Sequence, residues 1–334
     1  MANSCLLIDG DIYIYKASAA TEKLVNFDGD NCFMLGSLSE AKEIFTETIN
    51  SFLEDFKTKE YIIALSDKEN FRKDILPTYK ANRKNKPKPV QYNFLREWVE
   101  DEYKTMCRPG LEGDDILGIL ATSPVIIKNP NKIIISVDKD MKTLPARYYD
   151  SGKEERKRIT EQEANYNHML QTLTGDTADN YKGLQGVGKV NAEKIINKDM
   201  TYQEMWQAVL SAYREKGFTE KDALIQARVA RILRHYDYDY KRKSVIYWDI
   251  KNEERSNSWL NVKAKVKVGK VNKGCNMNGN YKLTDSFIED LEKMFPAIEI
   301  KSDTSLQEIY YNAGVRKVVE TLKRIKDKQN KEVY

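Results

Sequence analysis

Short apolar runs alternate with helically spaced apolar residues through the first half of the chain. The runs predict buried strands, and each of them ends in acidic residues: 5–11, 61–67 and 132–140. Apolar residues recur at helical spacing over 38–56, which predicts an amphipathic helix capped near Ser37 or Ser39. Strands that alternate with helices indicate an α/β fold with a mostly parallel central sheet and flanking helices.

The pattern becomes helical from about residue 160. Helices are expected within 161–180, 183–196, 201–217 and 219–236, followed by a short strand near 243–250. The remaining sequence alternates Val or Ala with Lys over 262–271, as in a half-buried strand, and closes with a basic amphipathic helix over 314–331. We therefore divide the chain into an α/β domain (1–155), a helical subdomain (156–254) and a basic C-terminal extension (255–334).

Composition is that of a soluble globular protein. The chain has 334 residues, of which 41% are hydrophobic, and this is enough for two domains with real cores. It contains no run of 18 apolar residues and no basic segment leading into an apolar stretch at its start, so neither a membrane span nor a signal peptide is expected. We expect a cytoplasmic protein.

Metal-binding side chains are restricted to oxygen donors. The four cysteines are scattered without a CxxC pair, and there are only two histidines. This argues against a structural zinc site and against a disulfide scaffold. Any metal is therefore expected to be Mg²⁺ or Mn²⁺, which carboxylates bind well.

Acidic residues gather at predicted strand ends, at one helix start and ahead of a Gly-rich turn. Because the carboxyl ends of parallel strands meet at one edge of a sheet, these carboxylates should converge. Two unit charges 4 Å apart repel by about 4 kcal/mol at an effective dielectric constant of about 20, so the cluster requires cations. Two divalent ions would satisfy it and would suit phosphodiester hydrolysis. The candidate metal ligands are Asp9, Asp67, Glu112, Asp114, Asp115, Asp138, Asp140, Asp176 and Asp179.

Three of these acids stand within four positions, directly before an apolar run. On a regular helix Glu112 and Asp115 share a face, while Asp114 points away from it. If the helix begins only at Asp114, all three side chains can face one site. The alternative for any single acid is a helix cap or a solvated charge.

Basic residues form a second signal. No acid occurs between Asp74 and Glu97, and this interval combines lysines and arginines with aromatic residues, which suits a nucleic-acid strand. A solvated linker is the alternative. The residues singled out there are Tyr79, Lys80, Arg83, Lys84 and Lys86.

A Gly-rich turn follows the last acids. Gly183, Gly186 and Gly188 allow close approach of a backbone, and Lys189 adds a charge at the start of the next helix. Alone this is a weak signal, because such turns are ordinary between helices, but its position directly after the acids strengthens it.

The motifs in order are "LLIDGD", "ALSD", "YKANR", "LEGDDILG", "ISVDKDM" and "TGDTADNYKGLQGVGKVNAEKI". Through them the chain resembles the 5′-nuclease superfamily of flap endonucleases and phage 5′→3′ exonucleases, and particularly the exonucleases of short-tailed coliphages. The resemblance covers about residues 5 to 250. It implies a PIN-like nuclease domain followed by a helix–three-turn–helix element.

The resemblance also implies roles for the singled-out residues. Lys80 and Arg83 would contact the scissile phosphate at the base of a helical arch, although the Pro-rich sequence after them makes a long arch helix doubtful. The Gly-rich turn would hold the duplex backbone, with a K⁺ ion bound there. One ion would be held mainly by Asp9, Asp67, Glu112 and Asp114, and the other mainly by Asp138, Asp140, Asp176 and Asp179, with Asp115 adjacent. A second acid in the first motif, Asp11, leaves open which of Asp9 and Asp11 binds metal.

We therefore expect a metal-dependent 5′→3′ exonuclease that acts on 5′ ends of duplex DNA and on RNA in RNA–DNA hybrids by two-metal-ion catalysis. The alternatives are a flap endonuclease of the same fold and a non-catalytic DNA-binding relative. The extension after residue 255 carries six lysines and no acid between Ser256 and Thr284. It is either a DNA-contacting element or a solvent-facing edge that resists aggregation.

Overall fold

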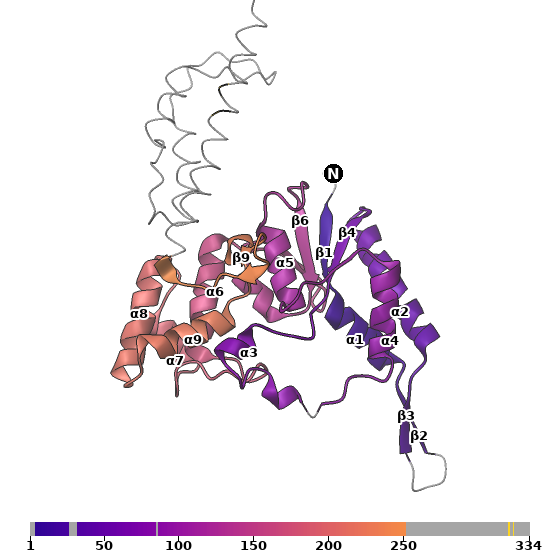
Figure 1. Ribbon diagram of the computed structural model, residues 1–334, viewed down its shortest axis with the longest axis horizontal. Helices are drawn as coiled ribbons and strands as arrows, with labels where there is room; N and C mark the ends of the chain where they lie inside the picture. The colour runs from indigo at the N-terminus through magenta and orange to yellow at the C-terminus, as the bar shows by residue number, and fades with distance from the viewer. Residues whose placement is uncertain (1–3, 27–31, 85, 252–319, 321–322, 324–334) are drawn as a thin grey trace, which may run out of the picture. The chain divides into compact units, whose positions relative to one another are not determined.

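A six-stranded sheet forms the centre of the α/β part. The computed structural model describes residues 4–26, 32–84, 86–251, 320 and 323 (Figure 1). Neighbouring strands pair in parallel except for β8, which runs antiparallel to β7. In sheet order the strands are β5 (Thr105–Met106), β4 (Glu60–Ala64), β1 (Cys5–Asp9), β6 (Lys132–Ser136), β7 (Arg147–Asp150) and β8 (Glu155–Arg158). The predicted mostly parallel sheet is thus confirmed.

Helices cover both faces of this sheet, which explains why its central strands are continuous apolar runs. All five residues of β1 are buried. Leu6 and Ile8 pack with the helices of one face, whereas Leu7 packs with α5 on the other. Figure 1 shows the helices that pack with Leu6 and Ile8 to one side of the strands. The helices are α1 (Gly10–Ala20), α2 (Leu38–Asp55) and α4 (Tyr92–Glu102) on the first face, and α5 (Gly113–Thr122) on the second.

A second core lies among the later helices. Trp206, 1% exposed, is packed with Met169, Val209 and Trp248 in this cluster. Three of the helices are preceded by a Thr that caps them. The Thr hydroxyl accepts a hydrogen bond from the N–H of the third helical residue, and the acidic side chain of that residue accepts one from the Thr backbone N–H. The two bonds satisfy donors that would otherwise be unpaired at the helix start. The helices are α6 (Glu161–Thr174), α7 (Lys189–Ile195), α8 (Tyr202–Glu215) and α9 (Glu220–Ala230).

Short elements complete the described chain. A short helix, α3, packs against α9 and precedes the segment that leads to α4 (Figure 1). The described residues of that segment form a single 3₁₀ turn, η1, rather than a long helix. The short elements are α3 (Arg72–Ile75), η1 (Ala81–Arg83), η2 (Lys139–Thr143), η3 (His235–Asp237), β2 (Lys23–Asn26), β3 (Cys32–Leu35), β9 (Tyr238–Asp239) and β10 (Ser244–Val245).

The last predicted helix, 219–236, is shorter than expected. It ends at Ala230 because the next residues use their backbone groups in tertiary contacts. The Arg231 carbonyl accepts from Arg72, and the Leu233 N–H donates to Asp115. The expected strand over 243–250 is reduced to two residues that pair with β9.

The predicted C-terminal elements and the domain boundaries are not settled by this fold. The predicted strand at 262–271 and helix at 314–331 lie outside the described residues, and the predicted domain boundaries at 155 and 254 stay predictions. No helix of the described segments has the length and apolar character needed to cross a bilayer.

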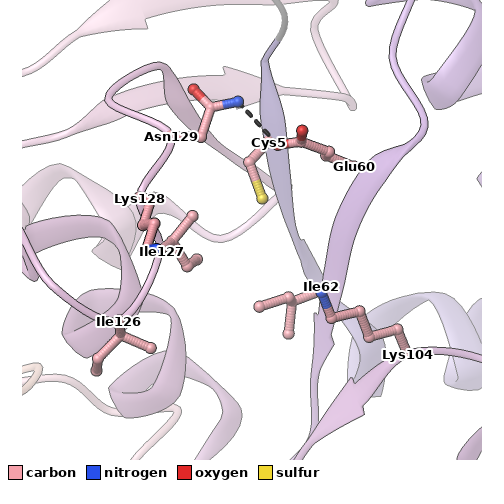
Figure 2. A pocket seen from close by; sticks show the side chains of 8 residues that line it. All are labelled: Cys5, Glu60, Ile62, Lys104, Ile126, Ile127, Lys128 and Asn129. Carbon is pink, nitrogen blue, oxygen red and sulfur yellow. Dashed lines mark hydrogen bonds between the residues drawn. The ribbon is translucent and has the colours of Figure 1, made fainter.

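The edge of the sheet at which β1 and β4 begin borders a cavity of about 500 Å³ (Figure 2). Its lining includes the Cys5 thiol together with Ile62, Ile127 and the Lys104 side chain. Burial raises the pKa of Cys5, so this thiol is a buried apolar group rather than a nucleophile. The carboxylates discussed next follow the other ends of the strands.

Candidate active site

Acidic side chains from separate parts of the chain meet at the carboxyl edge of the sheet. Asp9 is the last residue of β1, and Asp138 follows its neighbour β6. Asp114 lies in the first turn of α5, which packs against β1. The sequence expectation that strand ends bring these acids together therefore agrees with the geometry.

Asp9 is the most enclosed of these carboxyls. It is 3% exposed, accepts a hydrogen bond of 2.7 Å from the Ser136 hydroxyl and caps α1 through the Ile12 N–H. Burial, together with the nearby charges of Asp11 and Asp138, raises its pKa to about 7. Burial also raises the pKa of Asp114 well above its ordinary value, and the charges of Asp9 and Asp138 add to this effect. These carboxyls lack a positive neighbour strong enough to offset their crowding.

Asp140 extends the cluster toward the helical part. Its carboxylate accepts from the Gln171 amide of α6 at 2.5 Å. Burial and the charge of Asp138 raise its pKa to about 7, and Asp176 contributes in the same direction. Asp176 itself is paired with Lys139 at 2.9 Å and accepts from the Ala178 N–H, so its pKa is lowered despite burial.

Glu112 caps the start of α5 at the centre of a network of basic side chains. Lys80 forms an ion pair with it, and the Tyr79 hydroxyl donates to it at 2.9 Å. The Lys80 and Arg72 charges hold the pKa of Glu112 at about 2 although burial opposes this. Tyr79 also donates to Asp179, which pairs with Arg83 at 2.5 Å. The "YKANR" segment is thereby fastened to two of the predicted metal ligands.

Tyr79 and Asp115 have partners that the sequence did not predict. Tyr79 is 3% exposed, so its ring is not available to stack on a base as expected. Asp115 is fully buried and pairs with Arg72 through two bonds of 2.7 and 2.8 Å, while Leu233 and Glu112 donate backbone N–H groups to it. The structure therefore gives both residues a positioning role.

Arg72 is the main residue that sequence reasoning missed. All five of its N–H groups have acceptors: the Asp115 and Glu112 carboxylates and the carbonyls of Val229 and Arg231. This guanidinium joins α3, α5 and the end of α9. The only signal in the sequence was an Arg close to "YKANR", with no acid beside it.

Asp67 and Asp11 stand apart from the buried acids. Asp67 accepts from the Gly110 N–H at 2.8 Å, and this bond lowers its pKa. Asp11 accepts from the Ser66 N–H, the Tyr92 hydroxyl and Arg96. Of the two acids in the first motif, Asp9 is thus the one without a basic partner.

The Gly-rich turn is required by close backbone packing. Gly183 has φ of +61°, and a Cβ there would lie 2.3 Å from the Gly175 nitrogen. Gly186 also has positive φ, whereas Gly188 has ordinary φ and open space around it. Lys189, at the start of α7, is exposed, as are Lys84 and Lys86 near η1.

Four of the nine predicted ligands are ion-paired with cations of the protein itself: Glu112, Asp115, Asp176 and Asp179. Seven of the nine predicted ligands form one electrostatically connected group: Asp9, Glu112, Asp114, Asp138, Asp140, Asp176 and Asp179. Within the described ranges, however, no three acidic, His or Cys side chains are already arranged around one point as ligands of an ion. The donor chemistry suits a hard divalent ion, and binding would require Lys80 and Lys139 to release their carboxylate partners.

Comparison with known proteins points to one family of nucleases. Residues 4–168, about half of the chain, match the family of 5′-3′ exonuclease N-terminal, resolvase-like domains. Over this range the chain is similar to the 5′-3′ exonuclease family. The matched range contains β1 to β8 with their helices, and it holds every acid of the cluster except Asp176 and Asp179.

Relatives of this family align over most of the chain. The exonuclease of Escherichia phage T7 is 29% identical over 73% of this chain and 92% of its own length, and the exodeoxyribonuclease of Enterobacteria phage T3 matches to the same extent. A 5′-3′ exonuclease of Buchnera aphidicola is 27% identical, with 73% of this chain and 91% of that protein covered. The D15 protein of phage T5, solved with metal ions, is 16% identical with a TM-score of 0.51, covers 68% of this chain and 89% of its own, and supports the fold.

Proposed function

We propose that this protein is a divalent-metal-dependent 5′→3′ exonuclease acting on duplex DNA, and on the RNA strand of RNA–DNA hybrids. The observation that carries the proposal is the group of enclosed carboxyls at the ends of β1 and β6 and the start of α5. Asp9 and Asp140 have pKa values raised to about 7 by burial and by neighbouring acids, so the folded protein lacks a counter-charge there. The match of residues 4–168 to a 5′-3′ exonuclease domain supports a nuclease, and the relatives that align with the chain are named exonucleases.

Two Mg²⁺ or Mn²⁺ ions would be held by the carboxylates that lie in the connected group. One ion would be held by Asp9, Glu112 and Asp114. The other would be held by Asp138, Asp140, Asp176 and Asp179. When bound, the ions supply a nucleophile at neutral pH and neutralise charge on the phosphate. Asp115 is left out because Arg72 already occupies its carboxylate. Asp67 instead fastens the loop at Gly110.

The basic residues would act on the DNA once the carboxylates are neutralised by metal. Lys80 and Arg83, which pair with Glu112 and Asp179 in the structure, would turn to the scissile phosphate and stabilise its developing charge. Tyr79 would position both acids through its hydroxyl.

Duplex binding is proposed for the exposed basic residues and the Gly-rich turn. Lys84 and Lys86 would attract phosphates beside the cleavage site, and Lys189 would do so beside the turn. A K⁺ ion at the Gly-rich turn is part of the same proposal, because backbone carbonyl oxygens are donors that suit a hard cation.

Product analysis tests the proposal. A duplex with a 5′-labelled single-stranded flap is incubated with the protein over a Mg²⁺ titration. Release of mononucleotides that depends on Mg²⁺ supports the exonuclease, whereas release of the intact flap would assign a flap endonuclease. Asp138→Asn should abolish cleavage and leave DNA binding largely intact. DNA binding without any metal-dependent cleavage would indicate a non-catalytic relative.

A further inference from the structure

A second cavity, of about 600 Å³, lies near the edge of the sheet opposite the carboxylates. Lys132 at the start of β6 and Arg147 at the start of β7 line it, and so does Arg158 at the end of the antiparallel strand β8. The acidic cluster follows the other ends of β1 and β6. A five-residue strand spans roughly 16 Å, so the two sites are separate.

Two arginines face each other directly in this cavity. The register of β7 and β8 pairs Arg147 with Arg158, and both side chains are exposed. Like charges that stand opposite one another in an antiparallel pair are destabilising. The same hairpin pairs Asp150 with Glu155, but there Lys157 forms an ion pair with Glu155 and relieves the repulsion.

The arginine pair has no such relief within the described part of the chain. Arg147 bonds the neutral Asn131 side chain, and Arg158 forms no ion pair there. Lys132 donates to the Leu120 and Ser123 carbonyls at the end of α5. The one acid that lines the cavity, Glu161, is already paired with Arg234.

The first turn of α6 borders the same cavity. Thr160 and Glu161, at the N-terminal end of that 14-residue helix, both line it, and two backbone donors of this turn are already satisfied by the capping box of Thr160 and Glu163. Two guanidinium groups in one cavity match the oxygens of a phosphate, which they bind in a bidentate manner.

We propose that this cavity, defined by Lys132, Arg147 and Arg158, binds the phosphate group of a nucleotide. Its volume is in the range of small-ligand sites and accepts a mononucleotide. The phosphate can belong to a free mononucleotide or to a nucleic-acid strand, and both sources present the same group to the arginines. The site is independent of the carboxylate edge and does not require the catalytic proposal.

Side-chain NMR of the full chain tests the site directly. The Arg Nε–H resonances are followed in EDTA, so that no divalent ion links the ligand to the acidic cluster, while thymidine 5′-monophosphate, inorganic phosphate or a single-stranded oligonucleotide is added. Saturable shifts of the Arg147 and Arg158 signals are expected with the mononucleotide or the oligonucleotide, and the tighter of the two identifies the source.

Matched variants separate a built site from general charge. Arg158→Gln should weaken binding by about tenfold or more, since a bidentate contact is lost. Lys153→Gln removes an exposed positive charge from the turn between the same two strands, outside the cavity lining, and should leave binding unchanged. Arg147→Gln serves as the second variant if Arg158→Gln does not fold. Absence of saturable shifts, or equal weakening by Lys153→Gln and Arg158→Gln, would overturn the proposal.

Discussion

Asp9→Asn should stabilise the metal-free protein, although it removes a proposed metal ligand. Asn has the shape of Asp and still accepts the hydrogen bond from the Ser136 hydroxyl, but it carries no charge. The pKa of Asp9 is raised from 3.8 to about 7 in the folded state. Because a shift of one pKa unit corresponds to about 1.4 kcal/mol, ionised Asp9 costs the folded protein about 4 kcal/mol above pH 7.

The sign of this effect sets its pH dependence. Below pH 3.8 the Asp9 carboxyl is protonated in both the folded and the unfolded state, so it costs no stability. As the pH rises toward 7, the unfolded chain ionises while the folded protein keeps its proton, and stability is lost. The side-chain NH₂ group of Asn has no assured acceptor, and burying it would cancel about 1–3 kcal/mol of the gain in stability. We expect a net gain of about 1–3 kcal/mol at pH 8, and a gain smaller by about 2–3 kcal/mol at pH 5.

Urea denaturation in EDTA at pH 8 and pH 5 measures both values. Asp11→Asn is the matched control, since the same chemical change two residues away breaks one of the two ion pairs of Arg96 and should not stabilise the protein to the same extent. Added Mg²⁺ should stabilise the wild type more than Asp9→Asn, because an ion that binds only the folded state shifts the unfolding equilibrium. If Asp9→Asn is less stable than the wild type at pH 8, or its advantage does not shrink at pH 5, the account of the enclosed charge is wrong.

Three further predictions concern stability. Arg72→Met should cost about 3–5 kcal/mol in urea denaturation by leaving buried Asp115 unpaired, and Arg72→Met with Asp115→Leu should recover part of this loss. Burial lowers the pKa of His168 well below 6.5, so stability should fall by up to about 1.4 kcal/mol per pH unit as the pH drops below 6.5. If His168→Gln leaves this dependence of stability on pH unchanged, the prediction is wrong. Gly183→Ala should cost more than about 2 kcal/mol because of positive φ and the clash with Gly175, whereas Gly188→Ala should cost under about 1 kcal/mol.

The sheet could be predicted from the sequence because its strands are short apolar runs with acids at their ends. The runs at 5–11, 61–67 and 132–140 correspond to β1, β4 and β6, and in each case the last residues of the predicted run follow the strand instead of belonging to it. The helix over 38–56 is also present, and its cap is Ser37. Helix α1 was not predicted, because its residues show no clear separation of apolar and polar faces.

The hairpin of β7 and β8 was missed for a different reason. Four-residue strands rich in Arg, Lys and Glu have the composition of a solvated linker. The sequence of residues 151–158, "SGKEERKR", therefore favours a domain boundary near 155 instead of a strand. Only pairing with β6 and β7 gives this segment its structure.

Within the candidate site, spacing predicted which acids converge but not their partners. Glu112 and Asp115 do share a helix face, as the periodicity requires, and Arg72 bonds both. Asp114 instead lies within electrostatic range of Asp9 and Asp138, whose charges raise its pKa. A basic partner distant in sequence, such as Arg72 for Asp115, leaves no periodic signal, so the division between enclosed and paired acids required coordinates.

Direct counting of bound Mn²⁺ by electron paramagnetic resonance tests the central claim that the carboxylate group holds divalent ions. We predict two ions per wild-type chain and the loss of at least one in Asp114→Asn. Asp74→Asn, which changes an exposed acid of α3, should retain both ions. A wild-type chain that binds no Mn²⁺, or an Asp114→Asn variant that binds as many ions as Asp74→Asn, would contradict the account.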